Sequence, residues 1–209
     1  MDLNLIQYIS EFTDLKTCLQ IVRMCKWTSR NIKIKYVNDE DLRCKITDHI
    51  LEQKRYSFVI ELNVNNNQKV RKISQLCNLQ KLYIDWNCGV TNDEIKNLNL
   101  IELYAHANSK INKIKHMTNL QKLCIGWNSG VNDAEIKELN LIKLDARDNP
   151  KISKISHMTG SFTSLQILNV DFNCGVTDYE IKDLNLVRLI AYGNPKIKRS
   201  TLYKFNKKY

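Results

Sequence analysis

The feature that most constrains this chain is a segment that repeats along it. Residues 78–82, Asn-Leu-Gln-Lys-Leu, recur at 119–123, and a looser copy occupies 163–168. A second type, Asn-Leu-Ile-Glu-Leu at 99–103, recurs at 140–144 and 185–189, so that the two types alternate. The first type returns after 41 residues, from 78 to 119, and then after 44, from 119 to 163, with three additional residues at 160–162. Such a chain builds its core by stacking similar units.

Each copy spaces its apolar residues as a half-buried strand followed by a turn. The pattern is L-x-x-L-x-L-x-x-N, for example Leu120, Leu123, Ile125 and Asn128. Alternation around the second leucine predicts a strand with one buried face. The asparagine is expected to hydrogen-bond the backbone where the chain leaves the strand. Seven aligned copies predict about seven parallel strands, centred on Leu62, Leu82, Leu103, Leu123, Leu144, Leu168 and Leu189.

The two types differ after the asparagine. The longer type continues with residues such as Thr177, Asp178 and Glu180, which predict a short capped helix on the outer face. The shorter type continues with an Ile-x-x-Ile pattern, as at Ile152 and Ile155, which predicts an irregular or 3₁₀ return.

The repeat pattern resembles that of leucine-rich repeat proteins over about residues 57–200. This resemblance implies an α/β solenoid of about seven units with a parallel sheet on its concave face. The longer units resemble the cysteine-containing repeats of F-box proteins, with Val176-Thr177-Asp178 as the matching step. A composition rich in Asn, Ile and Lys but poor in Gly and Pro resembles proteins of amoebal protists and of their large DNA viruses.

Residues 1–36 contain no copy of the repeat and are expected to form a small helical module. One amphipathic helix is predicted from Leu3 to Phe12, and a second after Asp14, which would cap it. The Asp14-Leu15 step and the closing Met24-Cys25-Lys26-Trp27 resemble a degenerate F-box, although the family's opening Leu-Pro-x-Glu is absent. The resemblance implies that a Skp1-like adaptor covers an apolar surface formed by Leu3, Ile6, Phe12, Met24 and Trp27. The alternative is a helical cap over the first repeat.

Two further segments flank the repeats. Residues 37–56 are predicted to form a polar connection with one helix, through Leu42, Ile46, Ile50 and Leu51. Residues 201–209 are predicted to form a basic C-terminal cap or tail, with Leu202 and Phe205 over the last unit. The net charge is +10, but residues 196–209 carry six basic and no acidic side chains, whereas residues 78–195 are neutral. A charge placed at the end of a neutral body makes nucleic acid an improbable partner.

The titratable residues predict no catalytic or metal centre. The seven cysteines include no C-x-x-C pair, so we expect them to be small buried apolar residues in a reducing compartment. The four histidines lack the spacing of metal ligands, and no catalytic motif occurs. We therefore expect no enzymatic activity, no metal and no cofactor. Neither a secretory signal nor a membrane span is visible, which predicts a cytoplasmic protein, in the host cell if the source is viral.

The outward positions of the predicted strands are the expected binding surface, because successive side chains of a strand alternate between its two faces. Aromatic, histidine and arginine residues there are of the kinds that dominate protein interfaces. Trp86, Trp127 and Phe172 recur just before the asparagine of each longer unit, either as an aromatic ridge or as packing residues over the turn, and their strict periodicity favours packing. The residues expected to bind a protein target are Tyr83, Asp85, Tyr104, His106, Asp145, Arg147, Asn169, Asp171 and Tyr192.

These features predict a protein that binds other proteins and is a monomer when free. The F-box resemblance implies the substrate-recognition subunit of a Skp1–cullin–F-box-type ubiquitin ligase, with the target held on the concave sheet. The alternative is a free-standing leucine-rich repeat binding protein with no role in ubiquitin transfer.

Overall fold

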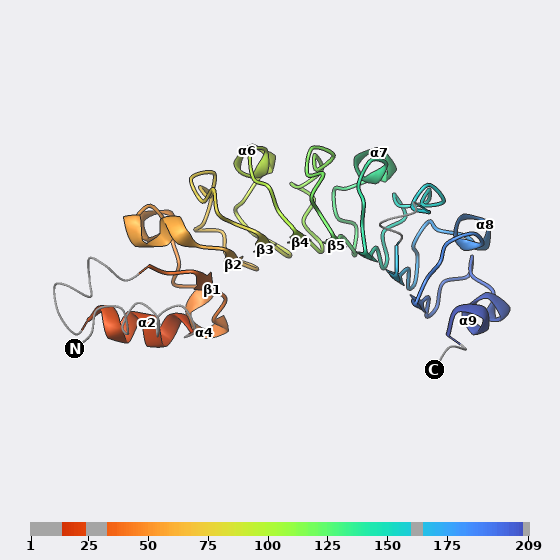
Figure 1. Cartoon of the computed structure of the whole chain (residues 1–209), viewed down its shortest axis with the longest axis horizontal. Helices are drawn as coiled ribbons and strands as arrows, with labels where there is room; N and C mark the ends of the chain where they lie inside the picture. Colours follow the sequence, from red (N-terminus) through yellow and green to blue (C-terminus); the bar gives the residue numbers. More distant parts are fainter. Residues whose placement is uncertain (1–13, 24–32, 160–164, 207–209) are drawn as a thin grey trace. The chain divides into compact units, whose positions relative to one another are not determined.

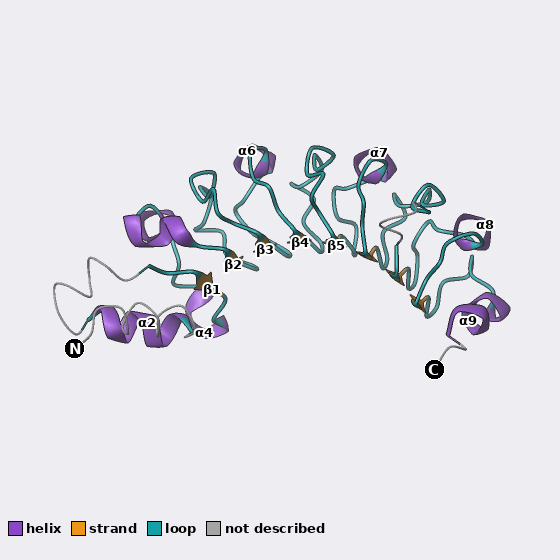
Figure 2. Ribbon diagram, in the orientation of Figure 1, coloured by secondary structure: helices purple, strands orange, loops and turns teal. Residues whose placement is uncertain are grey.

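The computed structural model describes residues 14–23, 33–159 and 165–206. The chain forms two compact units, Met1–Leu98 and Asn99–Tyr209. Each unit consists of short parallel strands joined by loops and short helices (Figure 2). The described part of the chain is therefore α/β and repetitive, as its sequence predicts.

The described part of the first unit contains three parallel strands, paired in chain order. Leu62 lies opposite Leu82, and both side chains are fully buried. The sequence pattern does not predict the first strand, because Asp39 stands where the repeat would place its third apolar residue. The parallel strands therefore begin before the expected boundary at residue 57. The strands are β1 (Tyr36–Val37), β2 (Glu61–Asn63) and β3 (Lys81–Tyr83).

The connection between β1 and β2 contains three short helices, so the prediction of one helix there is wrong. Asn67 binds the chain at this interruption. Its Nδ2 donates to the backbone carbonyls of Arg43 at 2.6 Å and Ile46 at 3.0 Å, so it ties the segment between α4 and α5 to the turn after β2. The helices are α4 (Glu40–Arg43), α5 (Asp48–Leu51) and the 3₁₀ helix η1 (Lys54–Phe58).

The N-terminal module is described only in part. Helix α2 (Leu15–Val22) begins after Asp14, whose side chain accepts a hydrogen bond from the backbone N–H of Thr17 at 2.7 Å. The prediction that Asp14 caps a helix is therefore confirmed. Leu15 and Cys18 are buried. The predicted helix from Leu3 to Phe12 and the other proposed adaptor contacts, Ile6, Met24 and Trp27, lie outside the described residues.

The described part of the second unit contains five parallel strands, again paired in chain order. Their central leucines stand in register, so that Leu103, Leu123 and Leu144 are successive partners and are fully buried. Within this unit the strands line the inner side of a bend, and helices α7 and α8 lie on the outer side (Figure 1). The strands are β4 (Glu102–Tyr104), β5 (Lys122–Cys124), β6 (Lys143–Asp145), β7 (Ile167–Asn169) and β8 (Arg188–Ile190).

A short helix follows the turn of every longer repeat, as predicted. The predicted cap is present at α7, where Asn132 accepts from the backbone N–H of Ala134 at 2.9 Å, whereas α6 and α8 have no side-chain cap hydrogen bond. The glutamate of each helix reaches the backbone of the preceding repeat. Glu135 accepts from the N–H groups of Ile114 and Lys115 at 2.6 and 3.1 Å, and Glu180 makes the equivalent pair of bonds. These carboxylates therefore link adjacent repeats. The helices are α6 (Asn92–Ile95) in the first unit, and α7 (Asp133–Ile136) and α8 (Asp178–Ile181) in the second.

The buried turn residue differs between the two types of repeat. In the shorter type it is asparagine, as predicted: Asn149 donates to the carbonyl of Ile125 at 2.8 Å and accepts from the N–H of Lys151 at 3.2 Å. In the longer type the prediction is wrong, because one additional residue precedes the buried position. The asparagine is then exposed and the next residue is fully buried. The exposed asparagines are Asn87, Asn128 and Asn173, and the buried residues are Cys88, Ser129 and Cys174.

Cysteine burial follows from this arrangement only in part. Cys18, Cys88, Cys124 and Cys174 are buried, whereas Cys44 and Cys77 are exposed, contrary to the expectation that all are core residues. Burial raises the pKa of the Cys174 thiol to about 11. At neutral pH this thiol is protonated and fills space in the turn.

The second unit ends in α9 (Arg199–Asn206), which packs against β8 and buries Phe205. Leu202 is half-buried, and Lys204 remains exposed. The helix therefore covers the last strand with its apolar side, while the Lys204 ammonium stays at the surface and donates to the carbonyl of Lys182 at 3.0 Å. Within the described residues, no helix has the length and apolar character needed to cross a membrane.

Substitutions at the buried leucine and at the two kinds of asparagine test the register. Leu123→Ala is expected to lower the free energy of unfolding by about 2–5 kcal/mol, because it truncates a fully buried side chain. Asn149→Ala is expected to lower it by about 1–3 kcal/mol through unsatisfied buried backbone groups. Asn173→Ala is the matched control and should change it by less than about 0.5 kcal/mol, since Asn173 is exposed and is not among the residues with a left-handed backbone. Urea unfolding measures all three, and equal effects of the two asparagine variants would contradict the register.

Glu180 provides a pH-dependent test of the link between repeats. Burial raises its pKa, but the backbone N–H groups of Ser156 and Ile155 outweigh this, so the pKa is lowered from 4.5. Its contribution to stability is therefore complete above pH 4.5 and is lost as the pH falls through the lowered pKa. Glu180→Gln is expected to destabilise the protein by about 1–3 kcal/mol at neutral pH and progressively less in acid. Unfolding measured across this pH range, with the exposed Glu138→Gln as control, distinguishes a loss of stability that depends on pH from one that does not.

Candidate functional site

The candidate site is the sheet surface of the second unit opposite the buried leucines. We call it the open sheet face. Because side chains alternate along a strand, it comprises the first and third residue of each strand and the second residue beyond its end. Its members are Glu102, Tyr104, His106, Lys122, Cys124, Gly126, Lys143, Asp145, Arg147, Ile167, Asn169, Asp171, Arg188, Ile190 and Tyr192.

The acidic side chains of this face lie beneath its surface. Glu102, Asp145 and Asp171 are each less than 10% exposed. Glu102 accepts from the Tyr104 hydroxyl at 3.0 Å and from the Lys122 ammonium at 2.9 Å. Asp171 accepts from the backbone N–H of Tyr192 at 2.5 Å. The negative charges of the face are therefore shielded from solvent and satisfied within the protein.

The basic side chains of the same face reach the surface. Lys122 keeps 44% of its side chain exposed while it contacts Glu102, and Arg147 keeps 32% exposed. Lys143 is half-buried and Arg188 is exposed. Within the described part of the chain, no hydrogen bond or ion pair engages either of these last two side chains. The face thus presents cations to solvent above buried carboxylates.

Arg147 is fixed in place by Asp145. Its Nε and Nη2 donate to the two carboxylate oxygens at 3.0 and 2.6 Å, and this contact raises the pKa of the guanidinium above its usual value. The glycine at position 126 makes room for this group. A Cβ there would lie 2.7 Å from Cγ of Arg147 and 3.0 Å from Nδ1 of His106. A side chain at residue 126 would therefore displace both groups.

Three potential metal ligands meet on this face, which the sequence does not predict. Among the described residues, His106, Cys124 and Asp145 place one donor atom each within 4.8 Å of one another. They belong to successive repeats, so they are about twenty residues apart and show none of the short spacings typical of metal motifs. The donor set of nitrogen, sulfur and oxygen matches zinc.

The hydrogen bonds of these residues argue against a metal. His106 Nδ1 accepts from the backbone N–H of Gly126 at 2.9 Å, so the ring is neutral and its proton is on Nε2. Neither ring nitrogen then has a lone pair available to an ion. Both oxygens of Asp145 are held by Arg147. An ion would have to break both interactions, so the cluster is better explained as a polar link between β4, β5 and β6.

Two aromatic side chains stand beside the open sheet face. Trp127 is 38% exposed and lies between His106, at a ring distance of 5.0 Å, and the Arg147 guanidinium, at 5.4 Å. Phe172 is 44% exposed and contacts the ring of Tyr192 edge-on at 6.0 Å. Both aromatic residues therefore pack against neighbouring repeats and still present a large apolar area to solvent. The sequence left two interpretations open, an aromatic ridge and packing residues over the turn, and these two side chains show features of both.

The backbone at these aromatic residues is left-handed. Trp127 and Phe172 have φ angles of 51° and 57°, a region that bulky residues seldom adopt. The shorter repeats place Ala107, Asp148 and Gly193 at this position, with φ angles of 52°, 52° and 66°. Aspartate and glycine tolerate this conformation, whereas an aromatic residue costs about 1–2 kcal/mol more. The longer repeats thus carry an exposed aromatic residue at a position that disfavours it.

The first unit carries the remaining residues predicted to bind a target. Trp86 repeats the aromatic pattern, with a φ of 55° and 49% exposure. Tyr83 is half-buried. Asp85 is buried, and its carboxylate accepts from Asn65 at 3.1 Å.

The predicted binding residues therefore fall into two groups. Asp85, Asp145, Asn169 and Asp171 are buried and hydrogen-bonded within the chain, so they shape the face without lying at its surface. Tyr104, His106 and Arg147 are half-buried, and Tyr192 is 76% exposed. The prediction omits the exposed cations. Their position in the repeat could have identified them. Lys122, Lys143 and Arg188 each stand at the first position of a strand, which the repeat register places on the outward face.

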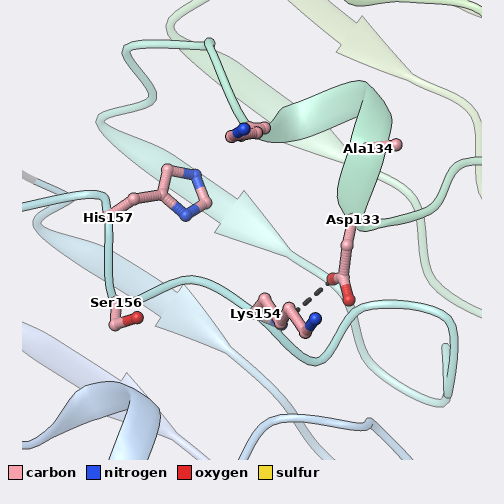
Figure 3. A pocket seen from close by; sticks show the side chains of 6 residues that line it. Asp133, Ala134, Lys154, Ser156 and His157 are labelled. Carbon is pink, nitrogen blue, oxygen red and sulfur yellow. Dashed lines mark hydrogen bonds between the residues drawn. The ribbon is translucent and has the colours of Figure 1, made fainter.

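A separate hollow lies on the outer side of the second unit. Its volume is about 460 Å³, and Asp133 and Ala134 of α7, together with Lys137 just after this helix, line one side of it. Lys154, Ser156 and His157 line the other, and Asp133 accepts a hydrogen bond from the backbone N–H of Lys154 at 3.0 Å (Figure 3). His157 stands where the sequence repeats a histidine, also found as His116, so its position is explained by the repeat. We therefore place the candidate site on the open sheet face.

Comparison with known proteins adds no family to these observations. The chain matches no protein-family model, and a search of the curated proteins returns no match.

Replacing Trp127 by asparagine tests whether this residue mainly stabilises the core by packing or mainly presents its ring to solvent. Asparagine tolerates a left-handed backbone, and relief of about 1–2 kcal/mol of strain offsets the lost ring contacts of similar size. The free energy of unfolding is expected to change by less than about 1 kcal/mol. A residue whose main role is core packing would instead lose about 3–5 kcal/mol. Urea unfolding, with Leu123→Ala as the scale of a true core truncation, decides between the two.

Proposed function

We propose that this protein is a binding module that holds a protein partner on the open sheet face of its second unit. The observation that carries the proposal is the pair of exposed aromatic residues, Trp127 and Phe172, at left-handed backbone positions. Strain at an exposed bulky residue adds nothing to the stability of the free protein, and such strain clusters at functional sites. A partner that covers these rings supplies the missing burial.

The chemistry of the face supports binding rather than catalysis. The thiol of Cys124 is only 3% exposed, and the lone pair of His106 Nδ1 is used by the backbone N–H of Gly126. Asp145 is neutralised by Arg147. The side chains that reach the surface include Tyr192, Arg147 and Arg188, which are of the kinds enriched in the centres of protein interfaces.

The more specific role comes from the sequence resemblances. We propose that the parallel strands form a leucine-rich repeat array, and that residues 1–36 hold a Skp1-like adaptor of a cullin-type ubiquitin ligase. The resemblance at Asp14-Leu15 and residues 24–27 supports this role, and the helix that begins after Asp14 is compatible with it. Co-purification of the full chain with a Skp1-like protein tests it directly. A binding module without a ligase role remains the simpler form of the proposal.

Site-specific photo-crosslinking tests the location of the partner. A benzoylphenylalanine residue replaces Tyr192, which is 76% exposed on the open sheet face, or Tyr179, which is 68% exposed on α8. The two positions are matched in side-chain type and exposure. We expect irradiation of cells that produce the protein to give a discrete protein adduct from position 192 and none from position 179.

The companion variant Phe172→Asn sharpens this experiment. It removes the ring beside Tyr192 at a backbone position that asparagine tolerates. The adduct at position 192 should weaken while the protein stays folded. Adducts of equal yield at both tyrosine positions, or an adduct only at 179, would place the partner elsewhere and overturn the proposal.

A further inference from the structure

On the open sheet face the negatively charged side chains are buried and the positively charged side chains lie nearer the surface. Its carboxylates are nearly inaccessible, with side-chain exposures of 8% for Glu102 and 7% for Asp145. Its cations lie above them, and those of Lys143 and Arg188 have no partner within the described residues. A charge in contact with solvent acts on a binding partner, whereas an ion pair such as Lys122 with Glu102 or Arg147 with Asp145 is largely cancelled. Lys143 and Arg188 therefore give the surface an excess of positive charge, although the repeat body is neutral.

We propose that the partner of the open sheet face is an acidic, extended peptide segment that runs across the strands. The inference rests on the proposed function and specifies the chemistry of the bound partner. Acidic side chains of the segment contact Lys122, Lys143 and Arg188, and an apolar side chain covers Trp127 or Phe172.

The spacing of the cations defines the segment. Lys122, Lys143 and Arg188 occupy the same register position on β5, β6 and β8. Adjacent strands lie about 4.8 Å apart, so three strand steps from Lys122 to Arg188 span about 14 Å. An extended chain rises about 3.3 Å per residue, so about four residues cover this distance. A short run of acidic residues is therefore sufficient.

Basic and aromatic residues together also occur in sites that bind single-stranded nucleic acid, where bases stack on exposed rings. Here the Arg147 guanidinium lies 5.4 Å from the ring of Trp127, and the rings of Phe172 and Tyr192 meet in a T-shaped contact. A base would have to displace Arg147 from both Trp127 and Asp145 to stack on the indole. An acidic peptide needs no such rearrangement, which is why we favour it.

Fluorescence anisotropy with a labelled peptide of six glutamates and two leucines tests the inference on the full chain. A peptide with glutamine in place of every glutamate is the control ligand, and a labelled thymidine oligonucleotide is the competing class. Lys143→Glu combined with Arg188→Glu is expected to weaken binding of the acidic peptide by about tenfold or more. The matched variant, Lys137→Glu with Lys154→Glu, makes the same change of net charge on the outer side of the second unit and should change the affinity by less than about twofold.

Each outcome bears on the inference separately from the proposed function. Loss of affinity confined to the Lys143 and Arg188 variant supports it. Equal loss in both variants, equal binding of the glutamine peptide, or tighter binding of the oligonucleotide that is lost in the same variant would overturn it. A partner adduct at position 192 without any binding of the acidic peptide would overturn the charge inference alone and leave the proposed function standing.

Discussion

Burial of one leucine per repeat against the leucines of its neighbours is the interaction on which each unit depends. The described strands are only two or three residues long, and a single strand of this length cannot shield its apolar side chain. Parallel pairing in register solves the problem, because it stacks Leu103, Leu123 and Leu144 directly on one another. The carboxylates of Glu135 and Glu180 then tie the outer loops of adjacent repeats together. α9 covers the leucine that has no further neighbour.

The turn after each strand connects this scaffold to the proposed function. One additional residue in the longer repeats shifts the buried turn position from the asparagine to Ser129 or Cys174. The left-handed point stays four residues after the central leucine of the strand in both types of repeat, and in the longer type an aromatic residue stands there, beside the open sheet face. The repeat backbone therefore fixes where Trp127 and Phe172 appear, while their side chains gain too little burial to justify their cost in the free protein.

Some polar residues of the open sheet face form buried hydrogen bonds, and others face solvent. The residue type alone does not show which of the two applies. Asp145 and Asp171 satisfy hydrogen bonds at depth, and Lys143 and Arg188 face solvent. The same division argues against a metal centre at the cluster of His106, Cys124 and Asp145. Its donor atoms are close enough to suggest one, but the Gly126 N–H and the Arg147 guanidinium already use the lone pairs that an ion would need.

The sequence by itself determined the strands centred on Leu62 to Leu189, their outward and inward faces, and the short helices of the longer repeats. Such features depend on contacts between residues that occupy the same position in neighbouring repeats, and the repeat pattern of the sequence shows which residues these are. It did not determine strand β1, the break near Arg43, or the burial of Ser129 in place of Asn128. Each of these depends on a hydrogen bond or an insertion that the repeat pattern does not encode. Only the tertiary structure decided which side chains of the candidate site reach solvent, because exposure depends on what neighbouring repeats place above each residue.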